Sequence, residues 1–429
     1  MKKIYFMATA LLLILFLFVS GCIQSDNVVI DLEVKPGLPD EKIEEGVISK
    51  IKDDECGNEP GNANEIIPGP SGHEGDYNID NPFRSLTIHP ENPDIVLVGT
   101  ERNGFLKSTD GGLSWTRHRK GIRHDKPVEG APPSELGYPE IYDIAMSESN
   151  PDIIYAATTG GPGPLAGEYG DDGGMYKSTD GGKTWKRRNC GLGNSWVWSV
   201  HISPDNPDEV VIGIAGGEVS GWGLPISGEY YEGGIFRTTD GGDNWNRVDV
   251  GTYDNVSAYR IIASARSNPS LLIVSGFNMI DGSKSLGFAK SMDGGKTWET
   301  FANELKVQGI DYFDISSDGS VIYAAASNIY KILKSEDGGN SWGEYAIGTS
   351  GYAIAVSPSD PRRVLFSKAH GVFLSTDGLK TEKQVIELTT SGHEHVSDMV
   401  FAPSDNNIVY VITSGSYNLY ESNDGGVVS

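Results

Sequence analysis

A nine-residue pattern recurs along this chain and constrains its fold more than any other feature. Five near-perfect copies begin at residues 107, 177, 237, 290 and 334, typified by KSTDGGKTW at 177–185, and weaker copies begin at 374 and 421. The repeated aspartates are Asp110, Asp180, Asp240, Asp293, Asp337, Asp377 and Asp424. Their spacings of 70, 60, 53, 44, 40 and 47 residues include values typical of one four-stranded propeller blade, about 40–45 residues. The longer spacings therefore indicate blades that carry insertions.

The residues between the copies support this interpretation. Each aspartate follows an apolar segment such as DIIYAAT at 152 or NIVYVIT at 407, and most of these segments follow proline turns such as SESNPD. Short runs of β-branched and aromatic residues between turn signals are typical of strands buried on both faces. Seven such units without helical periodicity predict an all-β fold, a single seven-bladed β-propeller of four-stranded blades. We expect blades to begin near Phe83, Ile141, Val197, Tyr259, Ile310, Gly351 and Val396.

The last blade lacks its final strand, because the sequence ends at Ser429 soon after the seventh copy. An open ring would leave unpaired strand edges, which natural proteins avoid. We therefore expect an N-terminal strand to complete the blade. Asn27–Val34 (NVVIDLEV) is the best candidate by composition, and the stretch just before Phe83 is the second.

The consensus SxDGGxTW resembles the Asp-box, or BNR, repeat. That repeat occurs in sialidases, sortilin-type receptors, xyloglucan-cleaving glycosidases and the photosystem II assembly propellers. The resemblance covers about residues 83–429 and implies a propeller fold, whereas it implies little about function. Within the box, Asp and Ser or Thr side chains can bond to turn backbone groups, and glycines can adopt positive φ. We therefore interpret the seven aspartates as turn clamps rather than active-site residues.

Candidate site residues come from the loops and from the starts of the inner strands. Long insertions lie between the second and third strands of blades two, three and four, and another joins blades one and two. Because strands alternate in direction, all of these loops are expected on the face opposite the boxes. Function in propellers usually depends on such elaborated loops. The predicted binding residues at the channel mouth and on the 216–234 loop are Arg84, Tyr142, Trp198, Arg260, Tyr352, Trp222, Tyr230 and Tyr231.

The sequence leaves two function classes open. A mixture of aromatic, arginine and carboxylate side chains at a channel mouth suits a glycan or a polar peptide segment, which favours a binding or scaffold role. The alternative is a glycoside hydrolase, sialidase-like or xyloglucanase-like, with an acid and base drawn from Asp143, Asp311 and Asp398. PFRSLTI at 82–88 is similar to the sialidase FRIP stretch, with Arg84 at the substrate-binding position, but it lacks the proline. No catalytic residue, metal or cofactor is assigned.

The N-terminus predicts the compartment. Lys2 and Lys3 precede an apolar run to Val19, and VSGC ending at Cys22 resembles the lipobox of prokaryotic lipoproteins. This implies a signal peptide over 1–21, lipid attachment at Cys22, a tether over 22–80 and the propeller over 81–429. An uncleaved anchor helix is the alternative. In both cases the expected location is the extracytoplasmic side of the cell membrane.

Charge and cysteine content narrow the partners. Removing residues 1–21, with two lysines and no acidic residue, moves the formal charge from −25 to −27. Such an acidic chain repels nucleic acid phosphates, so we expect a protein or glycan partner at the cell surface, bound by a monomer. Cys56 and Cys190 remain after Cys22. They could pair in an oxidising compartment, but spacing alone leaves the pairing open.

Overall fold

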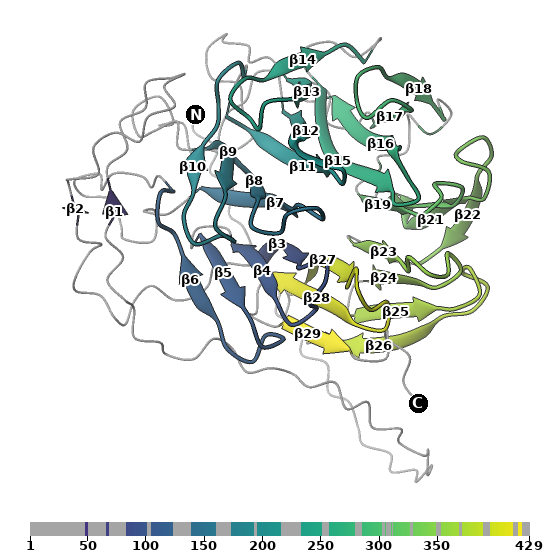
Figure 1. Ribbon diagram of the computed structural model, residues 1–429. Helices are drawn as coiled ribbons and strands as arrows, with labels where there is room; N and C mark the ends of the chain where they lie inside the picture. The colour runs from purple at the N-terminus through teal and green to yellow at the C-terminus, as the bar shows by residue number, and fades with distance from the viewer. Residues whose placement is uncertain are drawn as a thin grey trace, which may run out of the picture. The chain divides into compact units, whose positions relative to one another are not determined.

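The computed structural model describes residues 48–49, 66–67, 83–100, 104–122, 139–159, 173–192, 195–215, 233–250, 257–278, 285–302, 305, 310, 312–326, 329–348, 353–368, 371–388, 395–414 and 419–422. The chain divides into two units, Met1–Asp31 and Leu32–Ser429, and all of the described residues belong to the second. Apart from the short pair of β1 (Ile48–Ser49) and β2 (Ile66–Ile67), every described strand belongs to one of seven antiparallel sheets (Figure 1). Among these residues there is no helix of the length and apolar character needed to cross a membrane.

Each sheet begins with the strand that lies nearest the centre of a ring. These inner strands contact one another in chain order, and the last contacts the first. They are β3 (Phe83–Ile88), β7 (Glu140–Met146), β11 (Val197–Ser203), β15 (Ser257–Ala265), β19 (Tyr312–Ile315), β23 (Ile354–Val356) and β27 (His395–Phe401). The chain is therefore an all-β propeller, as the sequence predicts.

The remaining strands follow outward in chain order within each sheet. The second strands are β4 (Val96–Thr100), β8 (Ile154–Thr159), β12 (Asn206–Ile214), β16 (Asn268–Asn278), β20 (Ile322–Ala326), β24 (Val364–Lys368) and β28 (Val409–Ser414). The third strands are β5 (Phe105–Ser108), β9 (Gly174–Ser178), β13 (Gly234–Thr238), β17 (Ser285–Ser291), β21 (Lys331–Ser335), β25 (Gly371–Ser375) and β29 (Leu419–Ser422). The outer strands are β6 (Thr116–His118), β10 (Lys186–Arg187), β14 (Asn246–Val248), β18 (Glu299–Phe301), β22 (Gly343–Ala346) and β26 (Lys383–Glu387).

Six blades are complete and one sheet is not, which corrects the prediction of seven four-stranded blades. In the described part of the chain, the sheet of β27, β28 and β29 has three strands, whereas each of the other six has four. Among the described residues, no fourth strand pairs with β29. The predicted closing segment Asn27–Val34, the stretch just before Phe83 and the seventh box aspartate Asp424 lie outside the described residues.

The hydrophobic core lies between neighbouring blades. Second strands such as β4 and β20 are buried along their whole length, because one face packs on each adjacent blade. One cluster joins Leu97 and Phe105 of the first blade to Ile141, Ile154 and Trp185 of the second. The apolar segments before each box therefore occupy the positions that their composition predicted.

The repeated boxes form hydrogen-bonded turns between third and outer strands. In the second blade, Asp180 Oδ1 accepts from Ser178 Oγ at 2.8 Å and from the Thr184 backbone N–H at 2.8 Å, while Oδ2 accepts from Thr184 Oγ1 at 2.6 Å. Aspartates 110, 240, 293, 337 and 377 make the same kinds of bond. The Gly181 N–H donates to Asp152 O at 3.0 Å, which fixes the box turn on the turn between the first two strands of its own blade. In each of the six described boxes, the aspartate therefore bonds to residues of its own turn.

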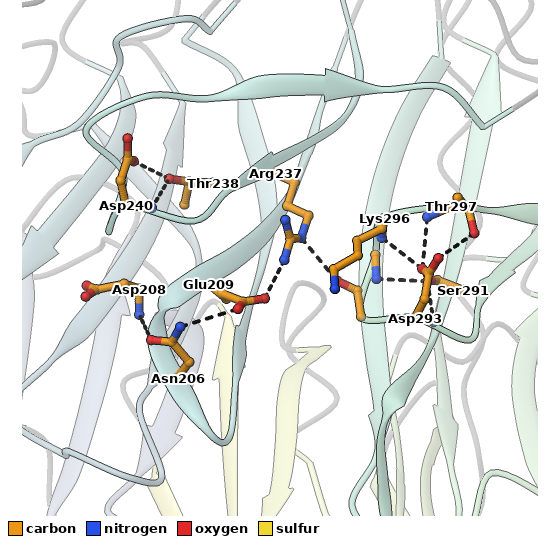
Figure 2. Close-up of polar contacts among 12 residues, drawn as sticks. Asn206, Asp208, Glu209, Arg237, Thr238, Asp240, Ser291, Asp293, Lys296 and Thr297 are labelled. Atoms are coloured by element: carbon orange, nitrogen blue, oxygen red, sulfur yellow. Dashed lines mark hydrogen bonds and ion pairs between the residues drawn. The ribbon is translucent and has the colours of Figure 1, made fainter.

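The first residue of the box has a role that sequence reasoning missed. Lys107 donates from Nζ to the carbonyl of Gly181 in the next blade at 2.6 Å, and Lys177 donates in the same way to Gly241 at 3.2 Å. Arg237 donates to Gly294 O at 3.3 Å and also pairs with Glu209 (Figure 2). A cation in one box therefore binds the glycine carbonyl of the following box, so these turns also connect neighbouring blades.

Candidate functional site

A cavity of about 630 Å³ lies between the inner strands and is lined by residues from all seven of them. Its lining includes Arg84, Tyr142 and Trp198 near the starts of their strands, and Pro90 and Glu148 beyond the ends. The cavity therefore extends along the inner strands, as a channel through the centre of the ring would. Because every blade contributes one strand, side chains far apart in sequence meet here.

Three predicted binding residues form a row along neighbouring inner strands. The rings of Tyr142 (β7) and Trp198 (β11) are nearly parallel, at 7°, with centroids 5.9 Å apart. The guanidinium of Arg84 (β3) lies 5.7 Å from the centroid of the Tyr142 ring and 3.8 Å from a carboxylate oxygen of Glu140. A stack of two aromatic rings with a guanidinium over one of them can contact an apolar group and bind a polar group beside it. The sequence placed these residues on adjacent strands but could not show that they stack.

The remaining predicted binding residues and the catalytic candidate Asp311 have no described side chain. Trp222, Tyr230, Tyr231, Tyr352 and Asp311 lie outside the described part of the chain, and Arg260 lies in β15 without a described side chain. Cys22, the predicted lipidation site, is also outside it. Their roles stay predictions.

Asp143 and Asp398 line the cavity and connect adjacent blades. Asp143 Oδ1 accepts from the Ile144 N–H at 2.9 Å and Oδ2 accepts from the Val200 N–H of the next blade at 2.9 Å. Asp398 accepts from the Met399 N–H at 2.8 Å and, across the seam to the first blade, from the Leu86 N–H at 3.2 Å. An inner strand is the edge of its sheet, so the N–H groups on the side away from the second strand have no partner strand. Each carboxylate satisfies two of these groups, one on either side of a blade seam.

Asp314 is the third member of this group, and sequence reasoning missed it. It accepts from the Ile315 N–H at 2.8 Å and from the Val356 N–H of the sixth blade at 2.7 Å. The candidate predicted in this part of the sequence was Asp311 instead. A usable signal was present, because an aspartate followed by Ile or Met recurs in the inner strands as Asp143–Ile144, Asp314–Ile315 and Asp398–Met399.

The pKa values of these three carboxyls are raised. Burial is the main cause in each case and raises the pKa to about 6 for Asp143, to about 6 for Asp314 and to about 7 for Asp398. The charges of Asp143 and Asp314 raise the pKa of Asp398 further, while the backbone N–H donors lower all three. These groups therefore titrate near neutral pH, which is typical of functional acids but also follows from a channel-lining structural role.

His201 of β11 also lines the cavity. Burial lowers the pKa of its imidazole to about 4, so the ring is neutral at physiological pH. In the described part of the chain, no group of three or more His, Cys, Asp or Glu side chains is placed to hold a metal ion. The channel therefore presents carboxyls, a neutral imidazole and the stacked aromatic row.

Comparisons with solved structures show the same fold. YCF48 bound to D1 peptide is 13% identical with a TM-score of 0.53 over 80% of this chain and 93% of that chain. An ancestral GH74 enzyme is 14% identical with a TM-score of 0.56 over 79% of this chain and 44% of that one. The extracellular domain of a hybrid two-component system from B. thetaiotaomicron is 14% identical with a TM-score of 0.51 over 81% and 41%. This chain thus spans less than half the length of the last two.

No protein-family model matches the sequence, and a comparison with curated proteins finds no match. At such low identities, the structural likeness shows the propeller fold alone. The function therefore has to be argued from the channel and its side chains.

Proposed function

We propose that this protein is an extracytoplasmic binding propeller, anchored to the membrane through a lipid on Cys22, that takes a glycan or a protein segment at the channel mouth. The observation that carries the proposal is the row of Arg84, Tyr142 and Trp198 beside a cavity of about 630 Å³. Aromatic and arginine side chains contribute most of the binding energy at many interfaces. The inserted loops of blades two to four would extend this surface, with Trp222, Tyr230 and Tyr231 as further contacts.

Two further parts of this proposal come from the sequence. The repeats would make the chain a member of the Asp-box propellers, and an N-terminal strand would complete the three-stranded sheet of β27–β29 as a seventh blade. The bonds of the six described boxes support the first part. The unpaired outer edge of β29 in the described chain supports the second, because exposed edges promote aggregation.

The structural neighbours support a binding role without identifying the ligand. One of them is described as bound to a peptide, and another is an extracellular domain of a signalling system. Both are propellers, and a binding role for this chain is consistent with these descriptions.

The test is a binding screen of the purified full chain against a glycan array and a peptide library, followed by Trp198→Ala. Loss of the indole removes half of the stacked ring pair, so we expect at least tenfold weaker binding, equal to about 1.4 kcal/mol. Leu113→Ala is the control, because Leu113 is an exposed apolar residue (63% exposed) in the box turn between β5 and β6, at the opposite end of the strands from the channel mouth. Equal weakening by both variants, or none by Trp198→Ala, would disprove the site.

A glycoside hydrolase is the second candidate. It is favoured by the raised pKa values of Asp143 and Asp398, which line the same cavity. Against it, both oxygens of each carboxylate already accept backbone N–H bonds, one from the same strand and one across a blade seam, which suits a structural role. Turnover in the same glycan screen that disappears in Asp143→Asn, with folding retained, would reverse this ranking.

A further inference from the structure

The outer edges of the first two blades carry a charge opposite to that of the whole chain. Residues 116–122 and 183–192 hold seven cationic side chains and no acidic one, in a chain of net charge −25. We call these seven residues the basic edge: Arg117, Arg119, Lys120, Lys183, Lys186, Arg187 and Arg188. The corresponding stretches of blades three to six contain acidic residues, among them Asp249, Glu299, Glu344 and Glu387. The basic edge is therefore a local feature of two blades.

The two halves of the basic edge are joined by the backbone. The Trp185 N–H donates to Lys120 O at 2.9 Å, so the end of one outer strand lies beside the start of the next. Arg188 is neutralised within the fold, because it pairs with Asp243 at 2.8 Å. Lys120, Lys183 and Lys186 are exposed and form no ion pair with another described residue. These three lysines are available to an acidic partner.

Cys190 lies at the end of the basic edge, two residues after Arg188. Its carbonyl accepts from the Trp245 N–H at 2.9 Å, which fixes its backbone against the third blade. Cys190 is disulfide-bonded. The chain has three cysteines, so within one molecule the bonded partner is Cys22 or Cys56. Both belong to the acidic segment that precedes the propeller.

The sequence around Cys56 is acidic and therefore complementary in charge to the basic edge. Residues 53–59 read DDECGNE, with four acidic side chains and no cation, whereas residues 186–190 read KRRNC. Cys22 has no acidic residue within three positions and is the expected lipid site. Opposite charges on two segments raise the local concentration of one near the other, and salt screens the effect over about 8–10 Å.

From this arrangement we infer that residues 53–59 dock on the basic edge and that Cys56 is the disulfide partner of Cys190. The bond forms by exchange with a disulfide-bearing oxidant of the extracytoplasmic space. The two cysteine thiols lose two protons and two electrons, and the oxidant's disulfide is reduced to two thiols. The lipid anchor is then joined to the propeller through residues 23–55, at the edge of the second blade. This inference is independent of the ligand proposed at the channel mouth.

The first test is peptide mapping of the full chain by mass spectrometry without reduction. We expect one peptide pair linked through Cys56 and Cys190, which separates after reduction. In Cys56→Ser, a thiol reagent should label Cys190, which tests the pairing even if the digest is incomplete. A bond between Cys190 and Cys22, a bond between two chains, or unlabelled Cys190 in Cys56→Ser would overturn the pairing.

The second test concerns the charges. In a glutathione redox buffer at low salt, Lys183→Glu combined with Lys186→Glu should shift the thiol–disulfide equilibrium toward the reduced form about three- to tenfold. Lys296→Glu is the matched control, because Lys296 holds the same box position as Lys183 in the fourth blade and is also exposed. It should leave the equilibrium unchanged, and 1 M salt should remove the difference. An unchanged equilibrium in the double variant, or an equal shift in the control, would overturn docking on the basic edge.

Discussion

Aspartates serve the propeller in two regions, and their environments are opposite. At the box turns, Asp110 and Asp293 accept hydrogen bonds from a backbone N–H group and from hydroxyls, and their pKa values fall to about 2. In the central channel, Asp143 and Asp398 also accept backbone N–H bonds, but their pKa values rise to about 6 and about 7. An aspartate at a box turn is thus more easily ionised than a free one. An aspartate that connects two blades in the channel is harder to ionise.

The difference comes from solvation and from the number of donors. A box carboxylate stays in contact with water and gains a hydroxyl donor at each oxygen, as Asp180 does from Ser178 and Thr184. A channel carboxylate gains two N–H donors, loses much of its water and faces other carboxylates. Hydrogen bonds favour the charged form of a carboxyl, whereas burial and like charges disfavour it. In the channel, burial and like charges have the larger effect, so the pKa rises.

The largest effect is expected from Asp314→Ala. This change leaves the N–H groups of Ile315 and Val356 without their acceptor at the seam between blades five and six, so we expect a loss of about 2 kcal/mol in the free energy of unfolding. The matched variant at a box is Asp180→Ala, where water can replace the lost acceptor and a loss of about 1 kcal/mol is expected. Urea denaturation of the two full-length variants and of the unmodified chain measures these losses in the free energy of unfolding. A greater loss in Asp180→Ala than in Asp314→Ala would contradict the distinction.

The next effect is a pH dependence of opposite sign in the two regions. The folded pKa of Asp398 lies above its unfolded value of about 3.9, so the native state binds more protons between about pH 4 and pH 7. Its contribution to stability is present below pH 4 and is lost as pH rises through 7. Relative to Asp398→Asn, the unmodified chain should therefore lose roughly 2 kcal/mol between pH 4 and pH 8, below the full linkage value because Asp398 is only partly buried. The difference between the two chains cancels the opposite contribution of His201.

Asp293→Asn provides the counterpart at a box. The folded pKa of Asp293 is about 2, below the unfolded value, so its contribution is present above about pH 4 and is lost as pH falls through 2. The two variants should therefore differ from the unmodified chain in different pH windows, as measured by thermal unfolding across pH 2–8. Parallel pH profiles for all three chains would show that the two regions do not differ in this way.

The sequence allowed the boxes to be predicted far better than the channel. Box geometry is local: residues 178, 180, 182 and 184 bond within one turn, so the repeat itself reveals them. The row of Arg84, Tyr142 and Trp198 was located because blade periodicity places inner strands side by side, but stacking depends on side-chain directions. Asp314 was missed because its partner Val356 belongs to the next blade, and the predicted candidate was Asp311, three positions earlier. The blade-joining role of Lys107 was missed for the same reason, since its acceptor is 74 residues away.

The smallest effect is expected from Gly182→Ala, which tests the positive-φ glycine of a box turn. Gly182 has φ +87, and an added Cβ would lie no closer than 3.6 Å to another atom, so the only cost of Gly182→Ala is the left-handed backbone, about 1 kcal/mol. At the same box position in the fifth blade, Gly339 has φ +91 and the Cβ would lie 2.2 Å from Phe301, so Gly339→Ala adds a steric cost and should lose up to about 2 kcal/mol. Urea denaturation of the two variants separates conformational strain from packing. Equal losses would mean that Phe301 moves aside freely, and the box of the fifth blade would then be less tightly packed than its neighbours indicate.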